Sequence, residues 1–96
     1  MFMAQVVDEY LSGIPAVLDG MRAALLANRP EDVALLAHKL KSSSGWLGAD
    51  RLVALCAEMD MSARKGNLDG ADERLRQVEL EVKRVEQALR GLAAGF

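Results

Sequence analysis

The sequence predicts an all-α protein, an antiparallel four-helix bundle with a short extra N-terminal helix. Apolar residues make up 51% of the 96 residues and aromatic residues only 4%, so the core consists mainly of alanine, leucine, valine and methionine, as helical packing prefers. Apolar residues also recur at helical spacing in segments that glycine or proline separates. A chain of this length fits one domain, residues 1–96.

The N-terminal third predicts two helical segments. Residues 4–11 have an apolar side, and Ser12-Gly13 interrupts the pattern. Pro15 suits the first turn of a second helix, which extends to residue 27 or 28. We therefore expect the first segment to be a separate short helix packed across one end of the bundle.

Three longer helices are predicted to follow. The first begins at Pro30, followed by two acidic residues that suit the positive end of a helix dipole, and extends to Gly45 or Trp46. The second includes residues 52–63 and is stopped by Gly66. The third begins at residue 68, capped by Asn67, and its apolar residues alternate at spacings of three and four as far as residue 92.

Two structures fit the apolar seam of the last helix: an intramolecular bundle and a dimeric coiled coil. The other helices also need partners for their apolar sides, and short connections favour antiparallel neighbours. The bundle is therefore the favoured structure, and we expect a monomer.

Composition and charge exclude several classes of function. The chain has 12 basic and 14 acidic residues, interspersed along its length, so it has no basic surface for nucleic acid. Its N-terminus has no basic region and carries Asp8 and Glu9, and no apolar run is long enough to cross a membrane. The single cysteine, Cys56, has no partner for an internal disulfide. We expect a cytoplasmic protein.

The only histidine, His38, is predicted to lie on the exposed side of helix 30–46. With about 100° of rotation per residue, five residues fall within about 80° and face the bundle. They are Val33, Ala37, Leu40, Ser44 and Leu47. His38 lies about 140° from Val33. Its neighbours on the helix surface are Ala34, Lys41, Ser42 and Gly45. All but the lysine are small, so the ring is expected to stand on an open platform.

This environment suits phosphoryl transfer. Neutral imidazole is a nucleophile, and phosphorylated imidazole can donate its phosphoryl group onward. Lys41 supplies positive charge one turn away, and Mg²⁺ would have to come with a partner. The sequence has no glycine-rich phosphate loop for ATP, and one histidine with one distant cysteine does not predict a metal site. An exposed histidine can also be incidental, so periodicity alone leaves that alternative open.

Residues 38–44, HKLKSSS, followed by LGA at 47–49 and by Leu52, resemble the H-x-L-K-G-x-S…L-G-A…L signature of histidine phosphotransfer (HPt) domains. These are four-helix-bundle modules of two-component phosphorelays, and the predicted helix order extends the resemblance over nearly the whole chain. The resemblance implies that His38 accepts a phosphoryl group from an aspartate of a response-regulator receiver domain and passes it to another receiver. It further implies a sensor or hybrid histidine kinase as partner and Mg²⁺ bound by the receiver.

The resemblance also implies roles for neighbouring residues. Lys41 would steady the phosphoryl oxygens, and Ser44 matches a small family position whose inward direction suggests packing. Ser42 departs from the family, which most often has glycine there. The protein would then be a phosphoryl carrier without ATP-dependent kinase activity of its own.

Three further residues near the histidine are candidate receiver contacts. They are Leu35, Lys39 and Trp46. Lys39 also fits a solvated charge, and Trp46 fits packing over the end of the bundle equally well. The alternative function is a non-catalytic helical interaction module or coiled-coil dimer in which His38 has no chemical role.

Overall fold

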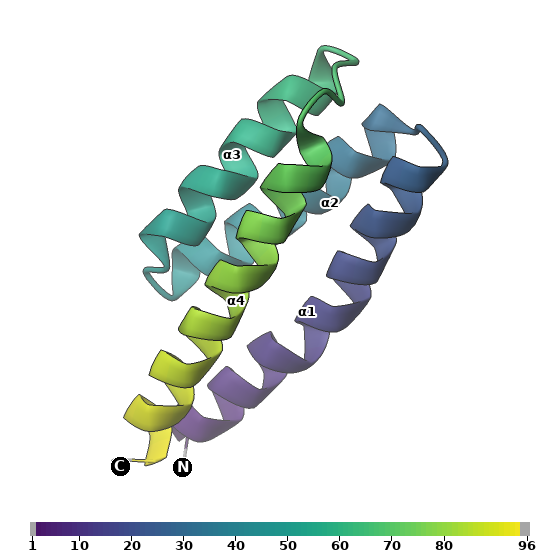
Figure 1. Cartoon of the computed structure of the whole chain (residues 1–96). Coiled ribbons are helices and arrows are strands. Elements are labelled where there is room, and N and C mark those ends of the chain that lie inside the picture. Colours follow the sequence, from purple (N-terminus) through teal and green to yellow (C-terminus); the bar gives the residue numbers. More distant parts are fainter. Residues whose placement is uncertain (1, 95–96) are drawn as a thin grey trace.

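A computed structural model describes residues 2–94, with the side chains of residues 5–92, and contains four helices in this part of the chain. They are α1 (Phe2–Leu26), α2 (Pro30–Trp46), α3 (Asp50–Arg64) and α4 (Ala71–Ala94). Consecutive helices run antiparallel (Figure 1), and α1 also packs against α4, which closes the bundle. The described residues contain no strand. The predicted antiparallel four-helix bundle is therefore confirmed.

Two residues after the end of each of the first three helices lies a residue with left-handed backbone, in the turn that reverses the chain. Asn28, Gly48 and Gly66 have φ values of 54°, 72° and 75°. After α3, the N–H of Gly66 donates to the carbonyl of Ala63 at 2.9 Å, and the next N–H donates to Ser62 at 3.0 Å. These bonds satisfy carbonyls that the helix end would leave unpaired. The connections are short as a result, and neighbouring helices are held antiparallel.

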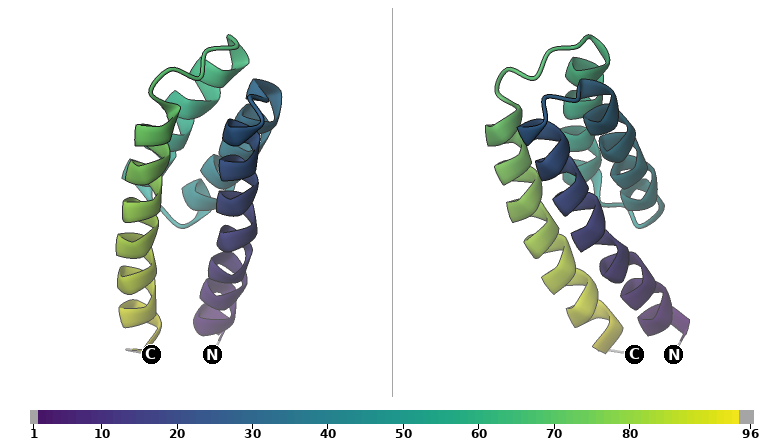
Figure 2. Two further views of the ribbon diagram at one scale, coloured as in Figure 1. Left: turned by 45° about the vertical axis from the view of Figure 1, so that its right-hand side comes forward. Right: turned by 90° about the vertical axis from the view of Figure 1, so that its right-hand side faces the viewer.

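The core runs through the middle of the bundle, and all four helices contribute to it. The largest fully buried side chains include Met21, Leu40, Leu52 and Met59, one or more from each of α1, α2 and α3, and α4 adds Val78. The apolar seam of α4 thus packs inside its own chain. Its burial declines toward the C-terminus, where Leu92 is 51% exposed, because α1 and α4 extend together beyond the turn between α2 and α3 (Figure 2).

The separate short N-terminal helix is not present, and that prediction is wrong. α1 continues through Ser12-Gly13 and contains Pro15 in its interior. A proline there loses a helix hydrogen bond at a cost of about 3 kcal/mol. Burying one leucine, isoleucine or valine side chain contributes roughly 1.5–3 kcal/mol, and the buried positions of α1 keep helical spacing across the expected break. They are Val7, Leu11, Ile14, Val17, Met21 and Ala24. The free energy gained by burying these side chains exceeds the cost of keeping Ser12-Gly13 and Pro15 inside a helix.

The start of α4 also differs from the prediction, which placed it at residue 68 with Asn67 as its cap. The side-chain oxygen of Asn67 instead accepts the N–H of Asp69 at 2.9 Å, and Gly70 has a φ of 74°. An asparagine turn and a left-handed glycine both compete with helix formation. The helix therefore begins at Ala71, three residues later.

None of the helices in the described part of the chain has the length and apolar character needed to cross a membrane.

Candidate functional site

His38 lies on the outer side of α2, where it borders α3. Its side chain is 48% exposed, and its Nδ1 lies 3.5 Å from Oδ2 of Asp60 on α3. The two ring nitrogens point in nearly opposite directions, so Nε2 points away from the carboxylate of Asp60. The helical wheel therefore predicted the exposure of the ring correctly, and the structure adds a defined orientation.

Asp60 is the main feature of the site that the sequence analysis missed. Its side chain is only 7% exposed, and its other oxygen, Oδ1, accepts a hydrogen bond from Nε of Arg64 at 2.8 Å. A buried carboxylate is costly unless charged or polar partners satisfy it. Arg64 and His38 together supply those partners.

Asp60 determines what the imidazole can do. A carboxylate beside Nδ1 favours the tautomer that carries its proton on that nitrogen, which leaves a free lone pair on Nε2. The 3.5 Å separation exceeds the usual N–H···O range by about 0.3 Å or more, so a small closure turns the contact into a hydrogen bond. The arrangement thus prepares Nε2 as an outward-facing nucleophile.

A signal for Asp60 was present in the sequence. The buried residues of α3 follow helical spacing, and Asp60 falls within that stripe, four residues after Cys56 and next to Met59. Acidic residues are almost never fully buried unless they are paired. Arg64, one turn later, is a basic partner at the spacing that allows an ion pair.

The predicted platform is only partly on the surface. Ser42 and Gly45 are exposed, but Ala34 is buried, with 8% exposure. Ala34 lies about 100° from Val33 on the wheel, beyond the sector expected to face the bundle. The buried side of α2 is wider than predicted because α3 packs against it there. His38 therefore stands at the edge of the α2–α3 interface rather than on an open surface.

Lys41 lies one turn after His38 and is half-buried. It takes part in none of the ion pairs found among the described residues. Burial raises the pKa of the nearby Cys56 thiol to about 12, and the positive charge of Lys41 acts against that rise. The ammonium group of Lys41 is thus a positive charge beside the histidine that has no carboxylate of this part of the chain within ion-pair distance.

Ser44 is fully buried, in agreement with its predicted inward direction. Its hydroxyl and that of Tyr10 on α1 lie 2.7 Å apart in a hydrogen bond. Burial raises the pKa of the Tyr10 hydroxyl, and the hydrogen bond with Ser44 partly opposes this. The pair attaches α1 to the helix that bears the histidine.

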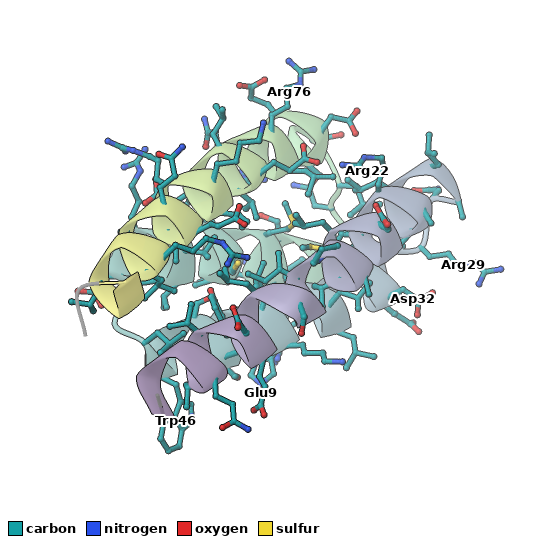
Figure 3. The ribbon with its side chains drawn as sticks, turned by 90° about the horizontal axis from the view of Figure 1, so that it is seen from below. Glu9, Arg22, Arg29, Asp32, Trp46 and Arg76 are labelled. Carbon is teal, nitrogen blue, oxygen red and sulfur yellow. The ribbon has the colours of Figure 1, made fainter. Side chains whose placement is uncertain are left out.

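The three candidate contact residues are all exposed. Leu35 is 67% exposed, Trp46 is 91% exposed, and Lys39 is exposed as well. Trp46 projects from the end of α2 into solvent (Figure 3), so it does not pack over the end of the bundle. Met61, the neighbour of Asp60 on α3, is also 60% exposed, and the sequence analysis did not single it out. Exposed apolar side chains are therefore present on both of the helices that form the site, α2 and α3.

The structure reveals no cluster of three or more histidine, cysteine or acidic side chains suited to a metal ion within the residues it describes.

Comparisons with known proteins agree with the four-helix fold. The family model of the Hpt domain matches residues 5–88. Among solved structures, the crystal structure of histidine-containing phosphotransfer protein B (HptB) from Pseudomonas aeruginosa PAO1 is similar, with a TM-score of 0.91 and 27% sequence identity. The match covers 95% of this chain and 79% of that one. No curated protein sequence matches the chain.

Proposed function

Because this chain belongs to the Hpt domain family, and so to the histidine carriers of phosphorelays, we propose that His38 is the residue that carries the phosphoryl group. The half-exposed ring with Nδ1 facing the buried Asp60 is the observation that supports this most directly. It provides the two features that the chemistry needs, an accessible nucleophilic nitrogen and a fixed ring.

Acceptance of the phosphoryl group is a single displacement. The lone pair of Nε2 attacks the phosphorus of an aspartyl phosphate on a receiver domain, the N–P bond forms, and the P–O bond to the aspartate breaks and returns a carboxylate. The ring becomes a cation that keeps its proton on Nδ1, and Asp60 stabilises that cation. Transfer to a second receiver is the same step in reverse.

Lys41 would neutralise part of the charge on the phosphoryl oxygens during transfer. Phosphoryl transfer depends mainly on positioning and charge neutralisation. Lys41, one turn after His38 on α2, has no ion-pair partner among the described residues, and neither has Lys39, which lies about 100° around the helix from His38. We propose that the receiver supplies the Mg²⁺. In this proposal the chain is a carrier, with no ATP-dependent kinase activity of its own.

The receiver would dock on the surface around His38. Leu35, one turn before His38 on α2, and Met61, next to Asp60 on α3, supply exposed apolar area, and an interface of this kind buries apolar residues at its centre. Lys39 lies about 100° around α2 from His38, and Trp46 lies eight residues farther along the helix; both would contact the edge of the partner.

Labelling by pre-phosphorylated receivers tests this proposal. The protein is incubated with a panel of phosphorylated receiver domains and Mg²⁺, and its intact mass is measured. We expect one added phosphoryl group that is acid-labile and absent in His38→Gln. A known phosphotransfer domain, treated alongside, verifies that each receiver is active as a donor.

Two outcomes contradict the proposal. In the first, receivers label the control domain but not this protein, which favours a non-catalytic interaction module. In the second, His38→Gln still acquires the label, which places the phosphoryl group on another residue. Circular dichroism of the variant ensures that loss of labelling is not loss of the helical bundle.

A further inference from the structure

The carboxylate of Asp60 is divided unequally between two partners. Its Oδ1 lies 2.8 Å from Nε of Arg64, and its Oδ2 lies 3.5 Å from Nδ1 of His38. Arg64 stands one turn after Asp60 in the last turn of α3, and its side chain is 64% exposed. The shorter and stronger contact of the buried carboxylate is therefore with the arginine.

The contact with Arg64 fixes the plane of the carboxylate. The torsion that rotates an aspartate carboxylate has a broad minimum, so the side chain has little intrinsic preference for one plane. The two oxygens are rigidly joined, and the place where Oδ1 is held determines the direction of Oδ2. A charge-assisted hydrogen bond to Oδ1 is strong enough to impose this direction.

We propose that Arg64 is a positioning residue for the transfer reaction: it orients Asp60 so that Oδ2 faces Nδ1 of His38 and keeps the ring proton on that nitrogen. This inference rests on the proposed function of His38 and extends it to a second layer of residues. Arg64 acts through Asp60 and need not touch the phosphoryl group. A simpler role also exists, because a basic residue in the last turn of a helix is favoured by the helix dipole alone.

The tautomer of His38 distinguishes these two roles without any partner protein. In protein labelled with ¹⁵N-histidine, NMR at a pH where the ring is neutral reports which nitrogen carries the proton. We expect mainly the Nδ1–H form in the wild type, a marked shift toward the Nε2–H form in Arg64→Gln, and recovery in Arg64→Lys. The inference is wrong if Arg64→Gln and the wild type have the same tautomer, or if the wild type is mainly Nε2–H.

Arg90 provides a matched control. It also bonds through Nε to a carboxylate four residues earlier, Oε2 of Glu86 at 3.3 Å, and its side chain is 57% exposed. It lies on α4 and also forms an ion pair with Asp8 of α1 at 3.6 Å, so its contacts are with neither α2 nor α3. Arg90→Gln should leave the ring tautomer and the rate of phosphoryl acceptance unchanged.

A double-mutant cycle tests whether Arg64 acts through Asp60. We expect Arg64→Gln to slow acceptance from a phosphorylated receiver by about threefold to tenfold, the low end of what loss of an orienting partner costs elsewhere. In an Asp60→Asn background the same change should have no further effect. If Arg64→Gln slows both backgrounds equally, Arg64 acts directly on the phosphoryl group or the receiver, and the inference is wrong. If the wild type accepts nothing, the proposed function fails, while the tautomer measurement still decides the role of Arg64.

Discussion

The helix pair α2–α3 and the helix pair α1–α4 differ in length, packing and chemistry. α2 and α3 have 17 and 15 residues, whereas α1 and α4 have 25 and 24 and project beyond them (Figure 2). A groove of about 300 Å³ lies between α1 and α4, bordered by apolar and charged side chains. The histidine, its buried aspartate and the free lysine all belong to α2 and α3.

This difference indicates how the fold positions a reactive group. A nucleophile must be held within a fraction of an ångström of its working position, so it benefits from helices that are packed without gaps. Leu40 and Leu52, from α2 and α3, are at most 1% exposed, and so are Met21 of α1 and Val78 of α4, so the two pairs differ in the groove and not in the burial of the core. The α1–α4 pair mainly has to bury apolar area, and an open groove there does not disturb the site.

The largest expected effect is on the free energy of unfolding. It compares a side chain in the core of α2 with one beside the groove between α1 and α4. Leu40→Ala removes a fully buried side chain from α2 and should lower the free energy of unfolding by about 3 kcal/mol. Leu18→Ala alters a half-buried side chain beside the α1–α4 groove, where the loss of apolar contact should cost only about 1 kcal/mol. Urea unfolding measures both. Equal losses would show that the two pairs are packed alike.

The next effect concerns the polar link between the pairs. Tyr10→Phe removes the hydrogen bond with Ser44 and leaves the buried serine hydroxyl without its partner, which should cost about 1–2 kcal/mol. The double variant Tyr10→Phe/Ser44→Ala removes both polar groups and should lose less than the sum of the two single changes. Strict additivity in urea unfolding would mean that the bond contributes nothing to the attachment of α1.

Much of the fold was predictable because the residues that start and end helices agree with the spacing of the apolar residues. α2 begins at the predicted Pro30 and ends at Trp46, one of its two predicted ends, and Gly66 follows α3 with the left-handed backbone expected of it. The prediction failed where these two kinds of sequence pattern disagreed. Pro15 is a strong local signal for a helix start, but the apolar stripe continues past it and determines the structure.

The site was predictable along α2 and not across to α3. The wheel placed His38, Lys41 and Ser44 correctly because they share one helix. It could not place Asp60 beside the ring, because that contact depends on how two helices pack. The same packing buries Ala34. Residue pairs from different helices require the three-dimensional structure.

A smaller effect tests whether docking is confined to the α2–α3 face. Leu35 and Leu80 are matched leucines, 67% and 63% exposed, on α2 and α4 respectively. Leu35→Ala should weaken binding of a cognate receiver by about fivefold, since apolar contacts near the centre of an interface contribute most. Leu80→Ala should have no effect. Titration calorimetry with the receiver compares them, and the opposite ranking would move the docking surface to the α1–α4 pair.

The smallest effect depends on pH. It reports how well the core around Cys56 on α3 excludes water. Burial raises the pKa of the Cys56 thiol from its ordinary 9.0 to about 12, with the charge of Lys41 opposing the rise. The folded state therefore keeps a proton that the unfolded chain releases above pH 9, so stability is complete below pH 9 and declines as the pH rises toward 12. At pH 9.5 the loss amounts to about 0.8 kcal/mol. Urea unfolding at pH 7.5 and 9.5 should detect it in the wild type but not in Cys56→Ala, which is less stable at both values. If both proteins lose the same amount between the two pH values, water reaches the thiol and the packing around Cys56 is open.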